Sequence, residues 1–429
     1  MLPAAFTKRM ATILGGEYPA FLDCYGRPPV RGLRVNTLRI APADFEKMHP
    51  WRLAPSGVLP EGYVLLEEAA GIGRHPYHMA GVIYMQEPSA MAPVAALPVR
   101  SGMRILDVCA SPGGKSTAMA ARMGGDGLLV SNEIVPNRAK VLSQNIQRMG
   151  IRNAVVTNAK PEALCEALSA AFDIVLVDAP CSGEGMFRKD EAAVQAWSEA
   201  HVLACAARQR AILQSAQKAV KPGGVLLYAT CTFSTEENED VVADFLQEHT
   251  DFALLEQKRL YPHRMPGEGQ FYAKLLRTGE AESFTETPRT QGSGAQRKLA
   301  ADALLALFPT LCTDTLSVLP DGRVFLLPSD MPAGLYAQRM LLGGLEAGEI
   351  KKDRFEPAHA LFQALGAFCT QRVALDSADV RTDAFLRGET LSVSGVSGFA
   401  AVCVDGFPLG FGKAVDGVLK NRLPKGLRR

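Results

Sequence analysis

Two cysteines of the 429-residue chain stand where apolar segments typical of buried strands come to an end. Cys181 follows the segment DIVLVDAP, which contains Asp178, and Cys231 closes the segment VLLYATC. A thiolate is a strong nucleophile, and covalent catalysis divides one difficult step into easier ones. A single cysteine at such a place is more often an inert buried side chain. Two of them, with a carboxyl group nearby, indicate a site for nucleophilic chemistry.

A glycine-containing loop follows an earlier apolar segment. Residues 103–108 (MRILDV) run into CASPGGKST, which opens a helix. Gly113 and Gly114 permit a tight turn and a close backbone approach to a ligand, in front of the helix N-terminal amides. Glu133 ends the next apolar segment, 20 residues after Gly113, where an acid can accept hydrogen bonds from ribose hydroxyls. The sequence therefore predicts an adenosine-bearing cofactor with Glu133 on its sugar.

Three adenosine-bearing ligands compete for this loop. A P-loop nucleotide is disfavoured because Cys109 occupies the position that requires glycine. A dinucleotide is disfavoured because the two glycines are adjacent and lack the G-x-G-x-x-G spacing. S-adenosyl-L-methionine carries no pyrophosphate and needs only a close backbone approach and an acid for the ribose, so it fits best. A turn without a ligand is the weaker alternative, since Asp107, the glycine pair and Glu133 occur together.

The elements that must position these residues alternate between strands and helices. Short segments rich in Val, Ile and Leu are separated by helical stretches, at 103–108, 128–133, 153–158, 173–180 and 225–231. Such segments suit strands buried on both faces of a parallel sheet, and the alternation predicts a doubly wound α/β domain. Ligands of such sheets bind beyond the carboxyl ends of the strands. We therefore expect the strands before Cys181 and Cys231 to be neighbours, with both thiols near Asp178.

Several helix boundaries can be read directly. One long helix is expected over 192–220, and Ser234 with Glu237 forms a capping-box pattern for a helix that reaches about residue 249. The polar, Gly/Ser/Thr-rich stretch 278–298 is typical of a linker. The expected domains are therefore an N-terminal module, a catalytic domain, this linker and a β-rich extension, at 1–98, 99–277, 278–298 and 299–429.

Composition limits the class of protein and of partner. Lys and Arg total 46 against 45 for Asp and Glu, and 47% of residues are hydrophobic, which excludes extensive disorder. A nucleic-acid partner would need a local basic surface. Residues 1–40 carry a net charge of +4, centred on 31–39, and 413–429 hold six basic residues against Asp416. Each stretch is interpreted either as a solvated segment or as a phosphate-contacting surface.

The nine cysteines and the apolar runs bear on metal binding and location. No CxxC pair exists, so zinc-finger spacing is absent and no metal is expected. The cysteine count is odd, no secretory signal is recognised, and no apolar run is long enough for a membrane span. We therefore expect free thiols in the cytoplasm and no membrane partner.

Three motifs in fixed order carry a family resemblance: CASPGGKST, DAPCSGEG and ATCTFSTEEN, at 109–117, 178–185 and 229–238. With them the chain resembles the Sun-type RNA (cytosine-5)-methyltransferases, in the bacterial ribosomal RNA branch. Further segments extend the resemblance over nearly the whole chain, at 34–39, 84–91, 267–277, 351–361 and 408–428. It implies a Rossmann-like methyltransferase sheet, an N-terminal RNA-recognition-like α/β module and a C-terminal PUA-like extension.

The resemblance also implies roles for individual residues. Cys231 would be the nucleophile, Cys181 would assist product release, and Asp178 would contact the cofactor region and the target base. Asn158 would lie beside the adenine, where many relatives carry Asp, and Arg138 would support the cofactor site. S-adenosyl-L-methionine would be held by Glu133 and by one loop, made of Cys109, Ala110, Ser111, Pro112, Gly113, Gly114 and Lys115.

The activity implied is methyl transfer to C5 of cytidine in small-subunit (16S) ribosomal RNA, through a covalent bond between Cys231 and C6. C5 of cytosine is a poor nucleophile, and a thiolate added at C6 makes it enamine-like. The target base must be unstacked or flipped to react. Transfer RNA as substrate, a ribosome-assembly factor with dispensable methylation and a small-molecule methyltransferase stay as alternatives. A monomer is favoured.

Overall fold

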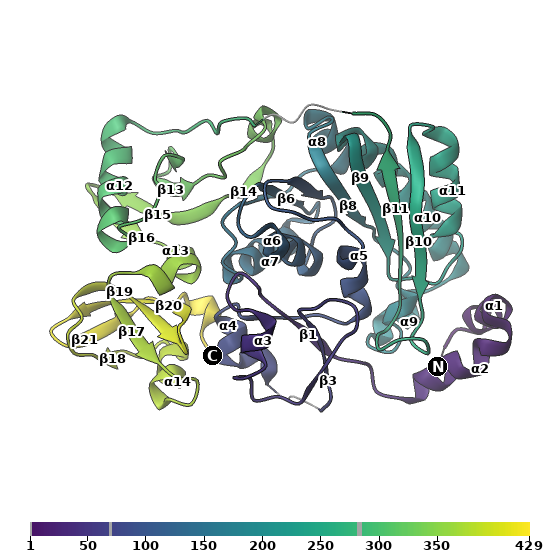
Figure 1. Cartoon of the computed structure of the whole chain (residues 1–429), viewed down its shortest axis with the longest axis horizontal. Coiled ribbons are helices and arrows are strands. Elements are labelled where there is room, and N and C mark those ends of the chain that lie inside the picture. The colour runs from purple at the N-terminus through teal and green to yellow at the C-terminus, as the bar shows by residue number, and fades with distance from the viewer. Residues whose placement is uncertain (1, 68–70, 281–284) are drawn as a thin grey trace.

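The computed structural model describes residues 2–67, 71–280 and 285–429 and is centred on an eight-stranded sheet (Figure 1). Its order is β10-β11-β9-β8-β5-β6-β7-β14. The five strands from β9 to β7 pair in parallel, whereas the pairs β10–β11, β11–β9 and β7–β14 are antiparallel. The strands are β5 (Arg104–Asp107), β6 (Leu128–Asn132), β7 (Ala154–Thr157), β8 (Phe172–Asp178), β9 (Val220–Thr230), β10 (Phe252–Leu260), β11 (Gln270–Arg277) and β14 (Met340–Gly343). The five predicted apolar segments form the parallel strands, which confirms the doubly wound α/β domain.

Helices cover both faces of this sheet because its strands are apolar on both sides. One buried cluster joins the strands to α8, α10 and α11, and the other joins them to α5, α6 and α7. The helices are α5 (Ala92–Ala95), α6 (Gly114–Met123), α7 (Pro136–Arg148), α8 (Pro161–Ala167), α9 (Glu191–Ala196), α10 (Glu199–Ala216) and α11 (Glu239–Glu248). The strand order reverses at β5, which lies between β6 and β8, so β5 marks the expected ligand-binding edge.

Two predicted helical stretches are present, but their boundaries differ from the prediction. The helix expected over 192–220 is broken at Trp197, and Ser198 caps the second part by accepting a hydrogen bond from the His201 amide. The helix expected after Ser234 begins at Glu239. Ser234 Oγ does accept from the Glu237 amide at 3.3 Å, but the Glu237 side chain turns away from the helix to another partner described below.

The N-terminal module has two separate parts (Figure 1). A four-stranded antiparallel sheet has the order β2-β3-β1-β4, whereas the first two helices pack against the catalytic domain through Phe6 and Phe21, which lie in one cluster with Phe187 and Phe233. The elements are α1 (Ala4–Leu14), α2 (Tyr18–Asp23), β1 (Gly32–Val35), α3 (Pro42–Phe45), β2 (Leu53–Pro55), β3 (Gly62–Leu65), α4 (Pro76–Met79) and β4 (Ile83–Met85).

The segment beyond the linker forms two small sheets and also supplies β14 to the central one. Their orders are β12-β13-β15-β16 and β17-β19-β20-β21-β18. The elements are α12 (Gly294–Leu307), β12 (Leu316–Val318), β13 (Arg323–Leu326), β15 (Leu345–Lys351), β16 (Arg354–Pro357), α13 (His359–Leu365), β17 (Arg372–Leu375), α14 (Val380–Leu386), β18 (Leu391–Ser392), β19 (Gly398–Val404), β20 (Phe407–Val415) and β21 (Val418–Asn421).

The expected linker 278–298 is shorter than predicted. Its residues 281–284 lie outside the described residues, and its last five residues belong to α12. Ser293 and Gln296 make a capping box there, because each side chain bonds the other's backbone amide at 3.0–3.2 Å. In the described ranges, no helix has both the length and the apolar character that a membrane crossing requires.

The basic stretch 31–39 is largely structural, which corrects its interpretation as a phosphate-contacting surface. Arg34 is fully buried and donates to Thr117 Oγ1 at 2.7 Å and to Gln86 Oε1 at 3.2 Å. Arg39 donates to the carbonyls of Gln363 and Ala364. Both arginines therefore join the N-terminal module to other parts of the chain.

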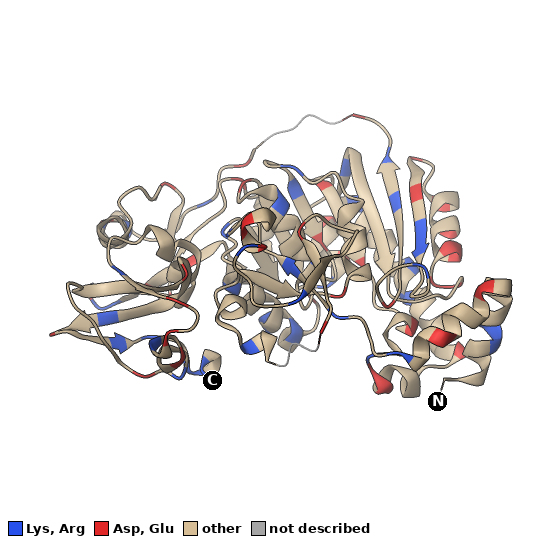
Figure 2. Ribbon diagram, turned by 60° about the horizontal axis from the view of Figure 1, so that its bottom comes forward, with Lys and Arg blue, Asp and Glu red and all other residues tan. Residues whose placement is uncertain are grey.

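The basic C-terminal stretch is not a solvated tail. It contains the end of β20, all of β21 and a final 3-10 turn. Its six basic residues are nevertheless exposed, and Figure 2 shows Lys and Arg around the C-terminus. A rigid surface therefore displays these charges.

Candidate active site

The two predicted thiols lie together at the carboxyl edge of the sheet. β8 and β9 are parallel neighbours, with Asp178 opposite Ala229, and this pairing brings Cys181 Sγ to 3.3 Å from Cys231 Sγ. Both cysteines are free and partly exposed. The predicted adjacency of these strands is confirmed.

The sulfur pair is asymmetric. A hydrogen bond from Cys181 lowers the pKa of Cys231 against the effect of burial, and Lys115 adds to this lowering. The same contact, together with burial, raises the pKa of Cys181 well above its usual range. These opposite shifts favour the thiolate form at Cys231 over the thiolate form at Cys181. A thiolate fraction at Cys231 is what a nucleophile requires.

Lys115 and Asp178 form an ion pair beside the sulfurs. Lys115 Nζ lies 2.7 Å from Asp178 Oδ2, and the lysine side chain is buried. Burial alone would lower the pKa of Lys115, but the Asp178 carboxylate raises it. The loop of residues 109–115 thus places the Lys115 ammonium group near Cys231, where its charge favours the thiolate form.

Glu237 joins the two cysteine-bearing loops. Its buried carboxylate accepts from the Ser182 amide and from Gln209 Nε2, both at 2.9 Å, and from Ser182 Oγ. Gln209 also donates to the Pro180 carbonyl at 3.0 Å. Glu237 lies in the loop after Cys231, and it binds Ser182 directly and Pro180 through Gln209, on either side of Cys181. This carboxylate therefore fixes the separation of the sulfurs. The capping-box pattern predicted a local role for Glu237 at the start of a helix, whereas its carboxylate binds Ser182 and Gln209.

Glu184 makes a second link, from the site to the first helix. Its fully buried carboxylate accepts from the Phe233 amide at 3.0 Å and from Trp197 Nε1 at 2.8 Å, and it pairs with Arg9 of α1. The Gly185 amide donates to the Cys231 carbonyl at 2.8 Å. Sequence reasoning missed Arg9 and Glu184; a carboxyl group within the Gly/Ser-rich SGEG segment was the available signal.

The glycine loop after β5 leaves little room for larger side chains. Gly113 has a φ of +111°, and a Cβ there would lie 3.1 Å from Leu142 Cδ1. A Cβ on Gly114 would lie 3.3 Å from Gln86 Nε2. The Pro112 carbonyl accepts from Asn145 Nδ2 at 2.9 Å, which fixes the loop to α7. Backbone therefore forms this part of the sheet edge.

The other predicted cofactor residues surround this loop. Glu133 is buried and accepts from the Val135 amide at 2.8 Å. Arg138 lies 3.4 Å from the Glu133 carboxylate and donates to the Ser111 carbonyl at 3.0 Å. Asn158 Nδ2 donates to the Glu133 carbonyl at 2.7 Å, so the Asn158 amide group is engaged with backbone. All of these residues meet at the edge formed by β5, β6 and β7.

The residues at this edge fit S-adenosyl-L-methionine. The first-turn amides of α6 lack intrahelical partners and favour an anionic group such as the amino-acid carboxylate. The Glu133 carboxylate, held in place by Val135 and Arg138, retains acceptor capacity for the ribose hydroxyls. Asp107 Oδ1 is buried without a hydrogen-bond partner among the described residues, and burial raises the pKa of Asp107 to about 7. The sheet, loop and acid define a Rossmann-like methyltransferase that uses S-adenosyl-L-methionine.

Comparison with known proteins identifies the family. The family models of the 16S rRNA methyltransferase RsmB/F, of the N-terminal domain of 16S rRNA methyltransferase RsmF and of the methyltransferase RsmF PUA domain match residues 94–276, 2–88 and 372–429. The ribosomal RNA small subunit methyltransferase F of Shewanella oneidensis is 33% identical over 95% of this chain and 92% of that protein. The enzyme of the same name from Vibrio parahaemolyticus is 32% identical over 100% and 98%. The chain belongs to the ribosomal RNA small subunit methyltransferase F family.

A solved structure agrees with this fold. A methyltransferase homolog protein from Pyrococcus horikoshii superposes with a TM-score of 0.58 and 28% identity, covering 64% of this chain and 94% of that one. The C-terminal PUA match coincides with the second small sheet, β17 to β21. The expected family, the methyltransferase sheet and the PUA-like extension are thereby confirmed.

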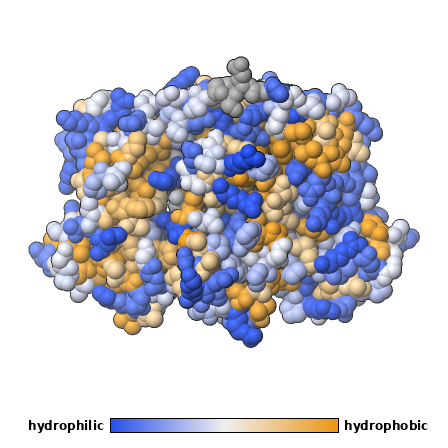
Figure 3. Space-filling view, in the orientation of Figure 1, coloured by the Kyte–Doolittle hydropathy of each residue, from blue (hydrophilic) through white to orange (hydrophobic). Residues whose placement is uncertain are grey.

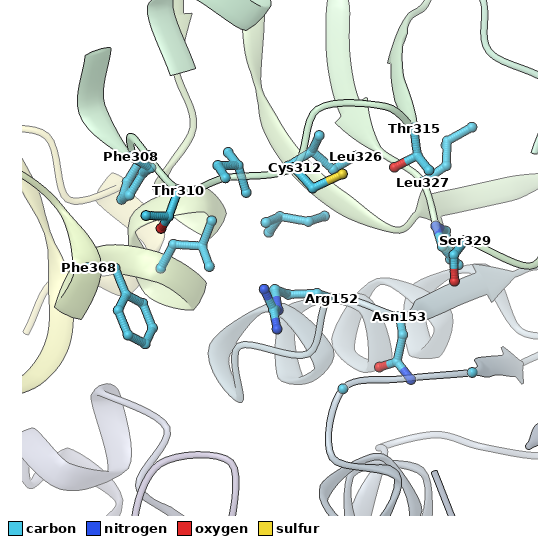
Figure 4. Close-up of a pocket in the computed structure, with 16 residues that line it drawn as sticks. Arg152, Asn153, Phe308, Thr310, Cys312, Thr315, Leu326, Leu327, Ser329 and Phe368 are labelled. Carbon is cyan, nitrogen blue, oxygen red and sulfur yellow. The ribbon is translucent and has the colours of Figure 1, made fainter. Parts of the chain in front are cut away.

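A cavity elsewhere in the molecule is separate from this site (Figure 4). It has a volume of about 560 Å³ and lies between Arg152 and Asn153 on one side and Phe308, Thr310 and Cys312 on the other. Arg152 and Asn153 precede β7, so the cavity opens at the amino edge of the sheet. The active-site residues are all at the opposite edge.

Replacing Glu133 with glutamine is expected to weaken cofactor binding by about 10-fold, since charged acceptors contribute about 1.5–3 kcal/mol and glutamine keeps part of the contact. Calorimetric titration with S-adenosyl-L-homocysteine measures the effect. Glu162→Gln on α8, an exposed position, is the matched control and is expected to bind as the wild type does. Equal affinities for the two variants would contradict the ribose role of Glu133.

Proposed function

We propose that the chain transfers a methyl group from S-adenosyl-L-methionine to C5 of cytidine in small-subunit ribosomal RNA. The observation that carries the proposal is the sulfur pair, with Cys231 Sγ 3.3 Å from Cys181 Sγ at the edge of the sheet. A methyltransferase acting on oxygen, nitrogen or a sulfur substrate needs no such pair, because those atoms are nucleophiles themselves. The names of the relatives support ribosomal RNA as the substrate.

The sulfur pair gives a balanced reaction. The Cys231 thiolate adds to C6 and forms a carbon–sulfur bond, while the ring takes up a proton at N3. We assign Cys181 as the source of this proton, so that Cys181 becomes a thiolate. The Asp178 carboxylate then accepts a hydrogen bond from the N3–H group. The bound cofactor supplies an electrophilic methyl group to C5.

Product release uses the second sulfur. Cys181 accepts the proton from C5, and the electron pair of that C–H bond restores the ring double bond. The Cys231–C6 bond breaks as this double bond forms, so that Cys231 leaves as the thiolate, and N3 releases its proton to solvent. The raised pKa of Cys181 makes its thiolate a strong base for this step.

We further propose that RNA is held from both sides of the catalytic domain, residues 99–277. The N-terminal module (1–98) and the extension (299–429) flank it, and the exposed basic residues after 412 belong to the extension. Residues 278–298 connect the catalytic domain to the extension. A basic surface confined to one part of the chain is compatible with an overall charge of only +1.

Methyl transfer to a defined nucleoside tests the function. The protein is incubated with tritiated S-adenosyl-L-methionine and either 16S rRNA or transfer RNA, and the RNA is digested to nucleosides. We expect label in 5-methylcytidine from 16S rRNA, and bisulfite sequencing of rRNA from cells with and without the protein locates the site. Label in another nucleoside, or in transfer RNA alone, would contradict the proposal.

A further inference from the structure

A second cavity lies where the three parts of the chain meet. It has a volume of about 560 Å³ and is formed by α4, by the end of α7 and by the C-terminal residues 423–429. Figure 1 shows the C-terminus beside α4, and Figure 3 shows hydrophilic side chains gathered in this region. This size suits a single nucleotide, since ligand pockets span about 300–1,000 Å³.

The residues that line this cavity carry positive charge, and no acidic side chain lies among them. They include Arg74, Arg148, Arg428 and Arg429, and no Asp or Glu. Arg429 pairs with Asp383 outside the lining, whereas Arg428 donates only to the Leu423 carbonyl, at 3.0 Å, among the described residues. Arg74 has no side-chain partner in the described ranges. An anion in the cavity would meet the guanidinium groups of Arg74, Arg148 and Arg428, which have no carboxylate partner among the described residues.

Arg148 is the most enclosed of these cations. Its guanidinium group donates to the carbonyls of His78 at 2.7 Å and Ile83 at 3.2 Å, and lies over the Tyr84 ring. These partners are neutral, and burial lowers the pKa of Arg148 to about 10. A buried cation without a carboxylate partner is costly, so a bound anion would stabilise it.

Two histidines add unused hydrogen-bonding capacity. Nδ1 of His78 and Nδ1 of His359 are buried and have no hydrogen-bond partner among the described residues, and both residues line the cavity. Burial lowers the pKa of each to about 4, so both rings are neutral near pH 7. They therefore add polar groups without further repulsion between cations.

The cavity is fixed in shape and connected to the cofactor loop. Gln363 Nε2 donates to the Met79 carbonyl at 3.0 Å and to the Arg148 carbonyl at 3.1 Å, which holds the three parts together. Asn145 contacts both sites, because its Nδ2 donates to Pro112 and its Oδ1 accepts from Arg148 at 3.1 Å. One side chain therefore contacts both the loop after β5 and a residue that lines the cavity.

We propose that this cavity binds one nucleotide of the RNA strand that carries the target cytidine. Its phosphate lies against Arg74, Arg148 and Arg428, and its base and ribose lie against the apolar wall that includes Leu423 and Leu427. The inference rests on the proposed function, since it takes RNA as the substrate. It assigns to the junction of three parts a role in holding the strand while the target base is flipped.

Charge reversal at Arg74 tests the inference. Arg74 is exposed and has no described side-chain partner, so Arg74→Glu should fold normally. Filter binding of labelled 16S rRNA should show about 10-fold weaker affinity, and a slope of log affinity against log salt that is smaller by about 1. Arg208→Glu, on an exposed face of α10, is the matched control. Equal RNA affinity of the two variants would overturn the proposal.

A second arm separates an RNA strand from a free nucleotide. Wild type and Arg74→Glu are titrated with cytidine 5′-monophosphate. Nucleotide binding that Arg74→Glu abolishes, together with unchanged 16S rRNA affinity, would assign the cavity to a free nucleotide and overturn the proposal. Because these assays measure binding, a wild type that binds 16S rRNA without methylating cytidine would contradict the proposed function alone.

Discussion

Cys231→Ala is expected to reduce methyl transfer to RNA by at least about 10⁴-fold. Without the sulfur no bond to C6 can form, so C5 keeps the low nucleophilicity of the free base. Loss of a covalent nucleophile in other enzymes costs up to about 10⁶-fold. Incorporation of tritiated methyl groups into 16S rRNA measures the change.

Two controls make this result specific. Cys312→Ala removes an exposed thiol far from the sulfur pair and should turn over as the wild type does. Cys231→Ala should still bind S-adenosyl-L-homocysteine, since Cys231 belongs to the loop after β9, whereas the predicted cofactor residues lie at the ends of β5, β6, β7 and β8. Turnover by Cys231→Ala within about 10-fold of wild type would remove Cys231 from the role of nucleophile.

The parts of the site that could be predicted depend on local sequence. Apolar segments such as 173–180 specify buried parallel strands, and strand ends place their following residues at one edge. Asp178, Cys181 and Cys231 could therefore be grouped from the order of residues along the chain alone. The glycine pair in CASPGGKST and the acid 20 residues later specify the cofactor loop in the same local way.

The parts that could not be predicted depend on contacts between distant segments. Glu237 lies 55 residues from Ser182, and Arg9 lies 175 residues from Glu184. A capping-box pattern at Ser234 gave Glu237 a plausible local role, but the buried amide of Ser182 is the partner that it satisfies. Arg34 was similarly ambiguous, because charge patterning does not distinguish a cation facing solvent from one buried against Gln86 and Thr117.

The sulfur contact explains why the two cysteines should fail differently. Cys181→Ala retains the nucleophile, and solvent can supply the N3 proton, but the variant lacks the base that removes the C5 proton, so methylated RNA should stay bonded to Cys231. A slow-migrating protein–RNA species should accumulate on a denaturing gel, with multiple turnover reduced by about 10²- to 10⁴-fold, as for loss of a general base. Its RNA should be labelled when tritiated S-adenosyl-L-methionine is used.

Cys181→Ser separates the two functions of Cys181. A serine hydroxyl still donates a hydrogen bond to Cys231 but is a far weaker base, so the adduct should again accumulate. Cys181→Ala removes the donor that lowers the pKa of Cys231, so that pKa rises. Adduct formation by Cys181→Ala should therefore need a higher pH than adduct formation by Cys181→Ser. Loss of methylation in both variants with no adduct on the gel would contradict the assignment of Cys181 to product release.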